Sequence, residues 1–160
     1  MKNEIDEIVD KYGKMIYRIA YIYLKSKTDA EDITQEVFLK YMMNKKPFKD
    51  EEHRKNWILK VTVHLCINLR KSAWKRNTVP LNDDTLELQT EEQYKIFYDL
   101  DCLDEKYKMV VQLFYFEDLS TENISKILGI SESNVRTRLN RARNELKRDF
   151  EKGEFLYGKI

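Results

Sequence analysis

The stretch GISESNVRTRLNRAR, residues 129–143, places four arginines within its last eight positions. Gly129 readily adopts the left-handed conformation that ends a helix, and Ser131 is a favourable N-cap for a new one. An apolar stripe then recurs at spacings of four, three and four residues, through Val135, Leu139, Ala142 and Leu146. This spacing predicts a helix with one face in a hydrophobic core and an arginine-rich face turned away from it.

The residues before this stretch predict a shorter helix that packs against the first. Ser120 can cap it, and its buried side would consist of Ile124, Ile127 and Leu128, with Ile130 filling the corner after the turn. Two helices joined by a short glycine-containing turn are typical of a helix-turn-helix, although an ordinary αα-hairpin with a basic face is the alternative. The outer face of the second helix offers groups that bind base edges or phosphates. The candidate DNA-binding residues are Ser133, Asn134, Arg136, Thr137, Arg138, Asn140, Arg141 and Arg143.

The charge of the chain is concentrated in segments, although its net charge is only +1 over 160 residues. Residues 54–76 contain seven basic residues and no acid, and residues 134–148 contain six basic residues and one acid. Between them, residues 82–105 contain nine acids and one lysine. Two basic segments on patterned helices favour two phosphate-binding surfaces over two merely solvated faces.

Helical periodicity covers most of the chain and predicts an all-α fold. A first helix has a core stripe that runs from Ile5 to Tyr23. A capping box of Thr28 and Glu31 would open a second, which buries one side and ends before Pro47. A third would span about 53–75, with its core face at Trp57, Ile58, Val61, Leu65 and Leu69. We therefore expect two small helical domains, 1–76 and 94–160, joined by a flexible linker over 77–93, where no period persists.

Other classes of protein are disfavoured by the composition. There is no apolar run long enough for a transmembrane helix, and the acidic start lacks the apolar region of a signal peptide. Cys66 and Cys102 show neither zinc-ligand spacing nor a disulfide framework, so we expect two buried thiols in a cytoplasmic protein. Carboxylates on the second helix lack the partner histidines of a metal site, so no metal and no cofactor are expected.

Three segments together resemble the bacterial sigma-70 family, in particular its extracytoplasmic-function (ECF) group. DAEDITQEVFLKYM (29–42) resembles the segment that binds core RNA polymerase. NWILKVTVHLCINLRKSAWKR (56–76) resembles the helix that recognises the −10 promoter element. LDEKYKMVVQLFYFEDLSTENISKILGISESNVRTRLNRARNELK (103–147) resembles the domain that binds the −35 element. The three motifs occur in the family's order and cover most of the chain.

The resemblance implies roles for residues on the two N-terminal motifs. The face that would dock on the β′ clamp helices of the polymerase consists of Asp32, Gln35, Glu36 and Leu39. The residues that would grip the −10 element, with the loop before them capturing an unstacked base, are Lys60, His64, Asn68, Arg70, Lys71 and Lys75. His64 stands where the family usually has Asn and is either a DNA contact or a solvated side chain. Trp57 is expected in the core, whereas Trp74 fits either packing or DNA contact.

The function that follows is promoter recognition as a dissociable, non-enzymatic subunit of RNA polymerase. The expected partners are the core polymerase, through its β′ clamp helices and β flap, promoter DNA and an anti-sigma factor; no small-molecule substrate and no membrane insertion are expected. A stand-alone helix-turn-helix regulator is the alternative, and a metal-dependent hydrolase lacks a coherent ligand set.

Two departures from the family concern local structure: Asp104 replaces a proline and would cap its helix, and Asp118 replaces a glycine in a loop.

Overall fold

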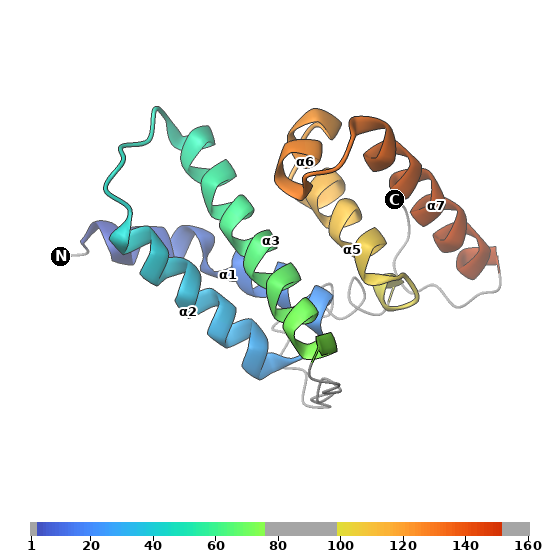
Figure 1. Ribbon diagram of the computed structural model, residues 1–160, viewed down its shortest axis with the longest axis horizontal. Coiled ribbons are helices and arrows are strands. Elements are labelled where there is room, and N and C mark those ends of the chain that lie inside the picture. Colours follow the sequence, from blue (N-terminus) through green and yellow to red (C-terminus); the bar gives the residue numbers. More distant parts are fainter. Residues whose placement is uncertain (1–2, 76–98, 152–160) are drawn as a thin grey trace. The chain divides into compact units, whose positions relative to one another are not determined.

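The computed structural model describes residues 3–75 and 99–151, and every element in these ranges is a helix (Figure 1). The chain divides into two compact units, Met1–Asp84 and Thr85–Ile160. The first holds α1 (Glu4–Leu24), α2 (Lys27–Met43) and α3 (Glu51–Lys75). The second holds α5 (Glu105–Val111), a π-helical turn η1 (Gln112–Phe116), α6 (Thr121–Leu128) and α7 (Glu132–Glu151). The all-α prediction is confirmed, and the predicted linker, 77–93, lies outside the described residues.

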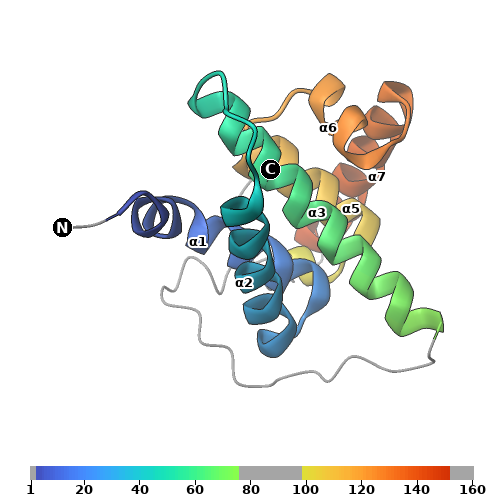
Figure 2. The ribbon, with the colours of Figure 1, turned by 60° about the vertical axis from the view of Figure 1, so that its left-hand side comes forward.

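The three helices of the first unit pack pairwise around one core, as Figure 2 shows for α2 lying beside α1 and α3. The predicted stripe of α2 is confirmed and that of α1 largely so, since Ile16, Ile19, Ala30 and Val37 are almost completely buried. Val9, which was expected on the stripe of α1, is 41% exposed. The start of α2 differs from the prediction. Its N-cap is Ser26, whose hydroxyl accepts from the Asp29 amide at 3.2 Å, so Thr28 lies inside the helix.

The inward face of α3 also differs from the expected stripe. Ile58 is fully buried as expected, but Trp57, Val61, Leu65 and Leu69 are only half-buried. The core is instead filled by Leu59, Thr62, Val63 and Cys66. Thr62 can be buried because its hydroxyl donates to the Ile58 carbonyl at 2.7 Å, which satisfies the polar group inside the helix.

The second unit is built on α7, which packs against both α5 and α6. The predicted stripe of α7 is confirmed, because Val135, Leu139, Ala142 and Leu146 are all buried. The turn before it is also as predicted. Gly129 ends α6 with a φ of 67°, and an added Cβ there would meet no atom within 4 Å, so glycine is favoured by backbone conformation and not by space.

Two local features of the second unit, the N-cap of α5 and the turn that follows α5, differ from the prediction. Asp104 is the N-cap residue of α5, but its side chain makes no capping hydrogen bond, so the expected cap is wrong. Asp118 adopts a left-handed φ of 55°, which aspartate tolerates better than most residues, and the substitution for glycine fits the loop. The π-helical turn between Gln112 and Phe116 shifts the helical register by one residue and was not visible in the periodicity.

Gln112, at the start of this turn, is completely buried, and within the described residues neither atom of its side-chain amide has a hydrogen-bond partner. Gln112→Leu should therefore raise the free energy of unfolding of the second unit by about 1–2 kcal/mol, because leucine fills a similar volume without the desolvation cost of an unpaired amide. Hydrogen exchange of peptides from α5 to α7 would measure the change. Gln35→Leu, on an exposed face of α2, is the control and should leave these peptides unaffected. Faster exchange in Gln112→Leu would show that the amide has a stabilising role.

Candidate functional site

The helix-turn-helix presents one continuous polar face on α7. Ser131 accepts a hydrogen bond from the Asn134 amide at 3.0 Å, which fixes the first turn of the helix, as predicted. Opposite the buried stripe, six of the eight candidate DNA-binding side chains are exposed, namely Ser133, Asn134, Arg136, Thr137, Asn140 and Arg141. Figure 1 shows α6 and α7 meeting at the turn, with α7 the longer of the two. A helix of this length, with its apolar face fully used, can enter a major groove only with this polar face.

The other two candidates, Arg138 and Arg143, are half-buried, and the structure gives Arg143 a packing role. Its Nε donates to the Tyr115 hydroxyl at 2.6 Å, and its guanidinium lies over the rings of Phe114 and Tyr115, 5.9 and 5.6 Å from their centroids. A second nitrogen donates to Asn140 at 3.1 Å. The structure therefore shows the Arg143 guanidinium packed on the aromatic side chains of η1, and its contact with DNA stays a prediction.

Glu132 is an acid on the polar face that the sequence patterns did not single out. Its Oε1 accepts from the Thr121 hydroxyl of α6 at 2.7 Å and lies 3.2 Å from Nη1 of Arg136. The i,i+4 spacing of an acid before an arginine could have revealed the ion pair, but not the contact with α6. One carboxylate thus joins the first residues of both helices of the motif to the most N-terminal of the four arginines.

The outer face of α3 carries the predicted basic stripe. Lys60, His64, Asn68 and Lys71 are all exposed, whereas the side chain of Lys75 lies outside the described residues. Arg70 does not belong to this face. Its guanidinium donates to the carbonyl oxygens of Tyr23 and Leu24 at 3.2 and 3.1 Å, so it binds the C-terminal end of α1.

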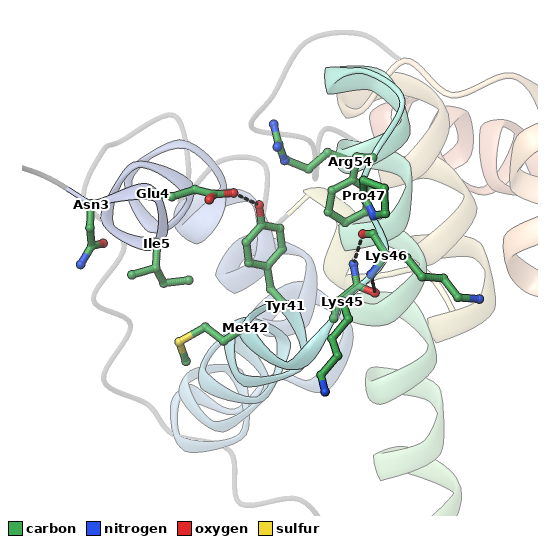
Figure 3. Close-up of a pocket in the computed structure, with 11 residues that line it drawn as sticks. Asn3, Glu4, Ile5, Tyr41, Met42, Lys45, Lys46, Pro47 and Arg54 are labelled. Carbon is green, nitrogen blue, oxygen red and sulfur yellow. Dashed lines mark hydrogen bonds between the residues drawn. The ribbon is translucent and has the colours of Figure 1, made fainter.

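A cavity of 660 Å³ opens beside the loop that joins α2 to α3 (Figure 3). Its wall includes Tyr41, Phe48 and Arg54. Glu4 of α1 also lines it, and Figure 3 shows this side chain reaching the Tyr41 hydroxyl. The Tyr41 hydroxyl donates to Glu4 at 3.2 Å, and burial raises the pKa of Tyr41, so the phenol stays neutral. The cavity therefore combines aromatic surfaces, hydrogen-bonding groups and a cation, which is a suitable lining for a nucleobase.

Trp57 belongs to the aromatic packing behind this cavity. Its ring meets Phe48 and Tyr41 edge-on, at centroid distances of 5.7 and 6.1 Å, and Tyr41 stacks on Phe48 at 5.9 Å. Trp57 thus packs against other aromatic rings of the first unit, but it is only half-buried and not in the core where it was expected. Trp74, whose role was left open, has no described side chain.

Glu51 fixes the first turn of α3 against α1. It accepts hydrogen bonds from Tyr12 and Lys11, the latter at 2.9 Å, and from Arg54 at 2.5 Å. The hydrogen bond from Tyr12, followed by that from Lys11, lowers the pKa of Glu51 to about 2. The carboxylate is therefore charged at neutral pH and holds Arg54 at the edge of the cavity, where the guanidinium lies 5.4 Å from the Phe48 ring.

The outer face of α2 is exposed along its whole length. Asp32, Gln35, Glu36 and Leu39 all lie on it, opposite the buried residues of the helix. Leu39 is 54% exposed, and two apolar neighbours that were not predicted extend this face, Met42 at 55% and Met43 at 77%. An acidic half beside an apolar half on one helix suits a helix-on-helix interface with a polar rim.

Neither cysteine forms a disulfide, and burial raises the pKa of both thiols to about 12. Cys66 is buried as expected. Cys102 is exposed as a whole residue, although its thiol is partly covered, so the prediction that it is buried is wrong. Over residues 3–75 and 99–151, no group of three His, Cys, Asp or Glu residues is arranged to hold a metal ion. In the same part of the chain, no helix has the length and apolarity needed to cross a membrane.

Comparison with known proteins identifies the family. A family model described as Sigma-70 region 2 matches residues 8–76, and one described as Sigma-70, region 4 matches residues 100–146. The RNA polymerase sigma factor SigV of Bacillus subtilis is 34% identical over 132 residues, which cover 79% of this chain and 78% of SigV. The chain therefore belongs to the sigma-70 family of RNA polymerase sigma factors.

Within this family the chain is a member of the ECF group. The ECF RNA polymerase sigma factor SigW of Bacillus subtilis is 30% identical over 165 residues, which cover 89% of this chain and 86% of SigW. Among solved structures, the sigma factor RpoE in complex with the anti-sigma factor NepR from Bartonella quintana superposes with a TM-score of 0.68. The match covers 91% of this chain and 96% of RpoE, and at 18% identity it shows a shared fold.

Proposed function

We propose that this chain is the promoter-recognition subunit of a bacterial RNA polymerase and that α7 reads the −35 element. The observation that carries the proposal is the capped helix-turn-helix, in which α7 buries four apolar residues and turns a polar, arginine-containing face to solvent. Arg136 lies in the first turns after the Ser131 cap, the part of a recognition helix that reaches base edges. Phosphate contacts from the other exposed groups would set the register on the duplex.

The −10 element is bound by the first unit. The exposed stripe of Lys60, His64, Asn68 and Lys71 on α3 supplies cations and hydrogen-bonding groups without an intervening acid. The cavity beside the α2–α3 loop has a suitable size and lining for one unstacked base of the non-template strand. Binding energy from these contacts keeps the strands apart, so promoter melting needs no nucleotide hydrolysis by this chain. Arg70 supports the stripe indirectly, because it fixes α3 to α1.

Core polymerase docks on the outer face of α2, where Asp32, Gln35 and Glu36 form the polar part and Leu39, Met42 and Met43 the apolar part. The clamp helices of β′ are the partner on this face, and the β flap is the partner of the second unit. Phosphodiester chemistry belongs to the core, so the chain itself is not an enzyme. It acts in the cytoplasm, where the polymerase and the chromosome lie.

An anti-sigma factor is a further proposed partner. The structural relative from Bartonella quintana was solved with one, and a second relative, CnrH, was solved in complex with the cytosolic domain of CnrY. Both relatives share the fold of this chain at 18% and 19% identity. Such a partner would compete for surfaces that the polymerase and the promoter use, and would keep the chain inactive until it is released.

The isolated chain should bind promoter DNA weakly, and core polymerase should convert weak binding into tight binding. The acidic segment 82–105 can attract the basic face of α7 and compete with phosphate. We expect dissociation constants of about 10⁻⁴–10⁻⁶ M without core, as in non-specific binding. Fluorescence anisotropy on fragments selected by the chain–core complex from a randomised promoter library would measure this.

The control for that titration is a scrambled fragment of equal length. Tight discrimination between the two fragments by the chain alone, in the range of about 10⁻⁸–10⁻¹¹ M that specific regulators reach, would contradict the proposal. That result would identify a stand-alone regulator instead.

A further inference from the structure

The side chains of Thr121, Glu132 and Arg136 form a connected chain across the turn of the helix-turn-helix. Oε1 of Glu132 accepts from the Thr121 hydroxyl at 2.7 Å, and the same oxygen lies 3.2 Å from Nη1 of Arg136. Thr121 is the first residue of α6 and Glu132 the first of α7. The guanidinium of Arg136 is therefore held not only by its own helix but also, through one carboxylate, by the neighbouring helix.

This arrangement contributes little to stability. The side chains of Arg136 and Glu132 are 58% and 45% exposed, and ion pairs at such exposure are screened by solvent and salt. An acid on a face that must approach phosphate also opposes DNA binding by its charge. A carboxylate in the first turn of α7 interacts favourably with the helix N-terminus but is unfavourable for general DNA affinity. Its contact with both Thr121 and Arg136 adds a second effect, on the arginine that it holds.

We propose that Glu132 is a specificity-determining residue, which holds Arg136 in the orientation for base readout and suppresses its use as a general phosphate contact. The proposal rests on the function proposed for α7. An arginine tethered at one nitrogen loses the freedom to reach neighbouring phosphates, and its remaining donors are directed as a fixed fork. Only a sequence that places an acceptor pair before this fork gains the full contact. Competing sequences leave this fork without an acceptor pair, which lowers their affinity relative to the preferred sequence.

The test is Glu132→Gln in the chain–core complex, assayed on a panel of −35 variants at several salt concentrations. Glutamine keeps an oxygen that can accept from Thr121 but loses the charge that holds Arg136. Discrimination at the one or two positions read by Arg136 should fall by about 3- to 10-fold, part of the roughly 5- to 150-fold that a good arginine–base contact supplies. Binding to scrambled DNA should become tighter, with a salt slope steeper by about one unit.

Two matched variants separate positioning from charge. Glu122→Gln removes an equal charge from a similar exposed ion pair, Glu122–Lys126 at 3.3 Å within α6, and should leave discrimination unchanged. Thr121→Val removes the anchor but no charge, so it should lower discrimination without changing the salt slope. In an Arg136→Ala background, Glu132→Gln should cause no further loss of discrimination. Melting temperatures should stay within a few degrees for all of these variants.

The possible outcomes distinguish the inference from the function on which it rests. If Glu132→Gln and Glu122→Gln change affinity alike and both keep the discrimination of the wild type, the charge is generic and the inference is overturned. If Glu132→Gln lowers discrimination equally with and without Arg136, the carboxylate acts through another group and the inference is also overturned. If the wild-type complex itself selects no −35 sequence, the proposed function fails, and the inference fails with it.

Discussion

A variant that carries Asp32→Arg and Gln35→Ala should bind core polymerase about 100-fold or more weakly than the wild type and should keep its fold. Both side chains are exposed on α2, opposite the buried Ile33 and Val37, so neither substitution removes a core contact. Reversing a charge at an interface costs several kcal/mol through like-charge juxtaposition and lost pairing. A titration of labelled core polymerase would measure the loss, and circular dichroism would verify the helical content.

The matched control is Glu7→Arg, which makes the same charge reversal at an exposed position in the first turn of α1. It should retain binding within a few-fold, because its side chain is not on the outer face of α2. Equal affinity of the double variant and the wild type would remove α2 from the polymerase interface. A further variant, Met43→Gln, would then show whether the apolar end of the helix is used in its place.

Arg136→Ala and Arg143→Ala should have different effects, although both remove one arginine from the same helix. Arg136→Ala should weaken binding by about 1–3 kcal/mol only where its preferred base is present, and relax selection at one or two positions of the −35 element. Arg143→Ala should weaken all promoters alike. It should also lower the free energy of unfolding of the second unit by about 1–2 kcal/mol, because it loses the Tyr115 hydrogen bond and two ring contacts.

The control for the second effect is Tyr115→Phe. It removes the hydroxyl that accepts from Arg143 and keeps the ring, so it should reproduce part of the destabilisation and leave the salt slope unchanged. A promoter panel assayed with reconstituted holoenzyme at several salt concentrations would measure both arginine variants. If Arg136→Ala reduced binding to every promoter by one common factor, Arg136 would be a phosphate contact and not a base reader.

The parts of the fold that sequence patterns predicted correctly depend on interactions between near neighbours. Ser120 and Ser131 cap their helices through amides three residues on, and Gly129 ends α6 through its own backbone angles. The stripe of α7 repeats within a single helix. Such signals are complete within a short stretch, so the helix-turn-helix could be located without tertiary information.

The parts that were missed depend on partners far along the chain or on packing. Arg70 was assigned to the −10 element by the family resemblance, but its guanidinium donates to carbonyl groups more than forty residues earlier, at the end of α1. The packing of Arg143 was missed because its partner Tyr115, 28 residues earlier, gives no periodic signal of its position. Thr62 was not expected in the core because threonine is polar. Its hydroxyl donates to a carbonyl of its own helix, and this hydrogen bond removes the usual cost of burial.

The candidate site was predicted better than the contacts that support it. The exposed faces of α2 and α7 follow from the stripes on their opposite sides. On α3 the basic face is exposed although the predicted core stripe was mostly wrong, and Arg70 leaves that face to bind the end of α1. The contact of Glu132 with Thr121 and the cavity wall formed by Tyr41, Phe48 and Arg54 depend on neighbours in three dimensions, and the periodicity contains no sign of them. Met42 and Met43 are apolar residues of the sequence, but their exposure depends on the end of α2 at Met43.

Transcription by purified core polymerase on a randomised promoter library, with and without this chain, tests the central claim most directly. Sequencing of the transcript 5′ ends would locate every start that depends on the chain. We predict a distinct set of such starts, preceded by two shared motifs at the −10 and −35 positions, with the −35 motif altered in Arg136→Ala. The same starts with and without the chain, or chain-dependent starts with no shared upstream motif, would contradict the assignment of this protein to promoter recognition.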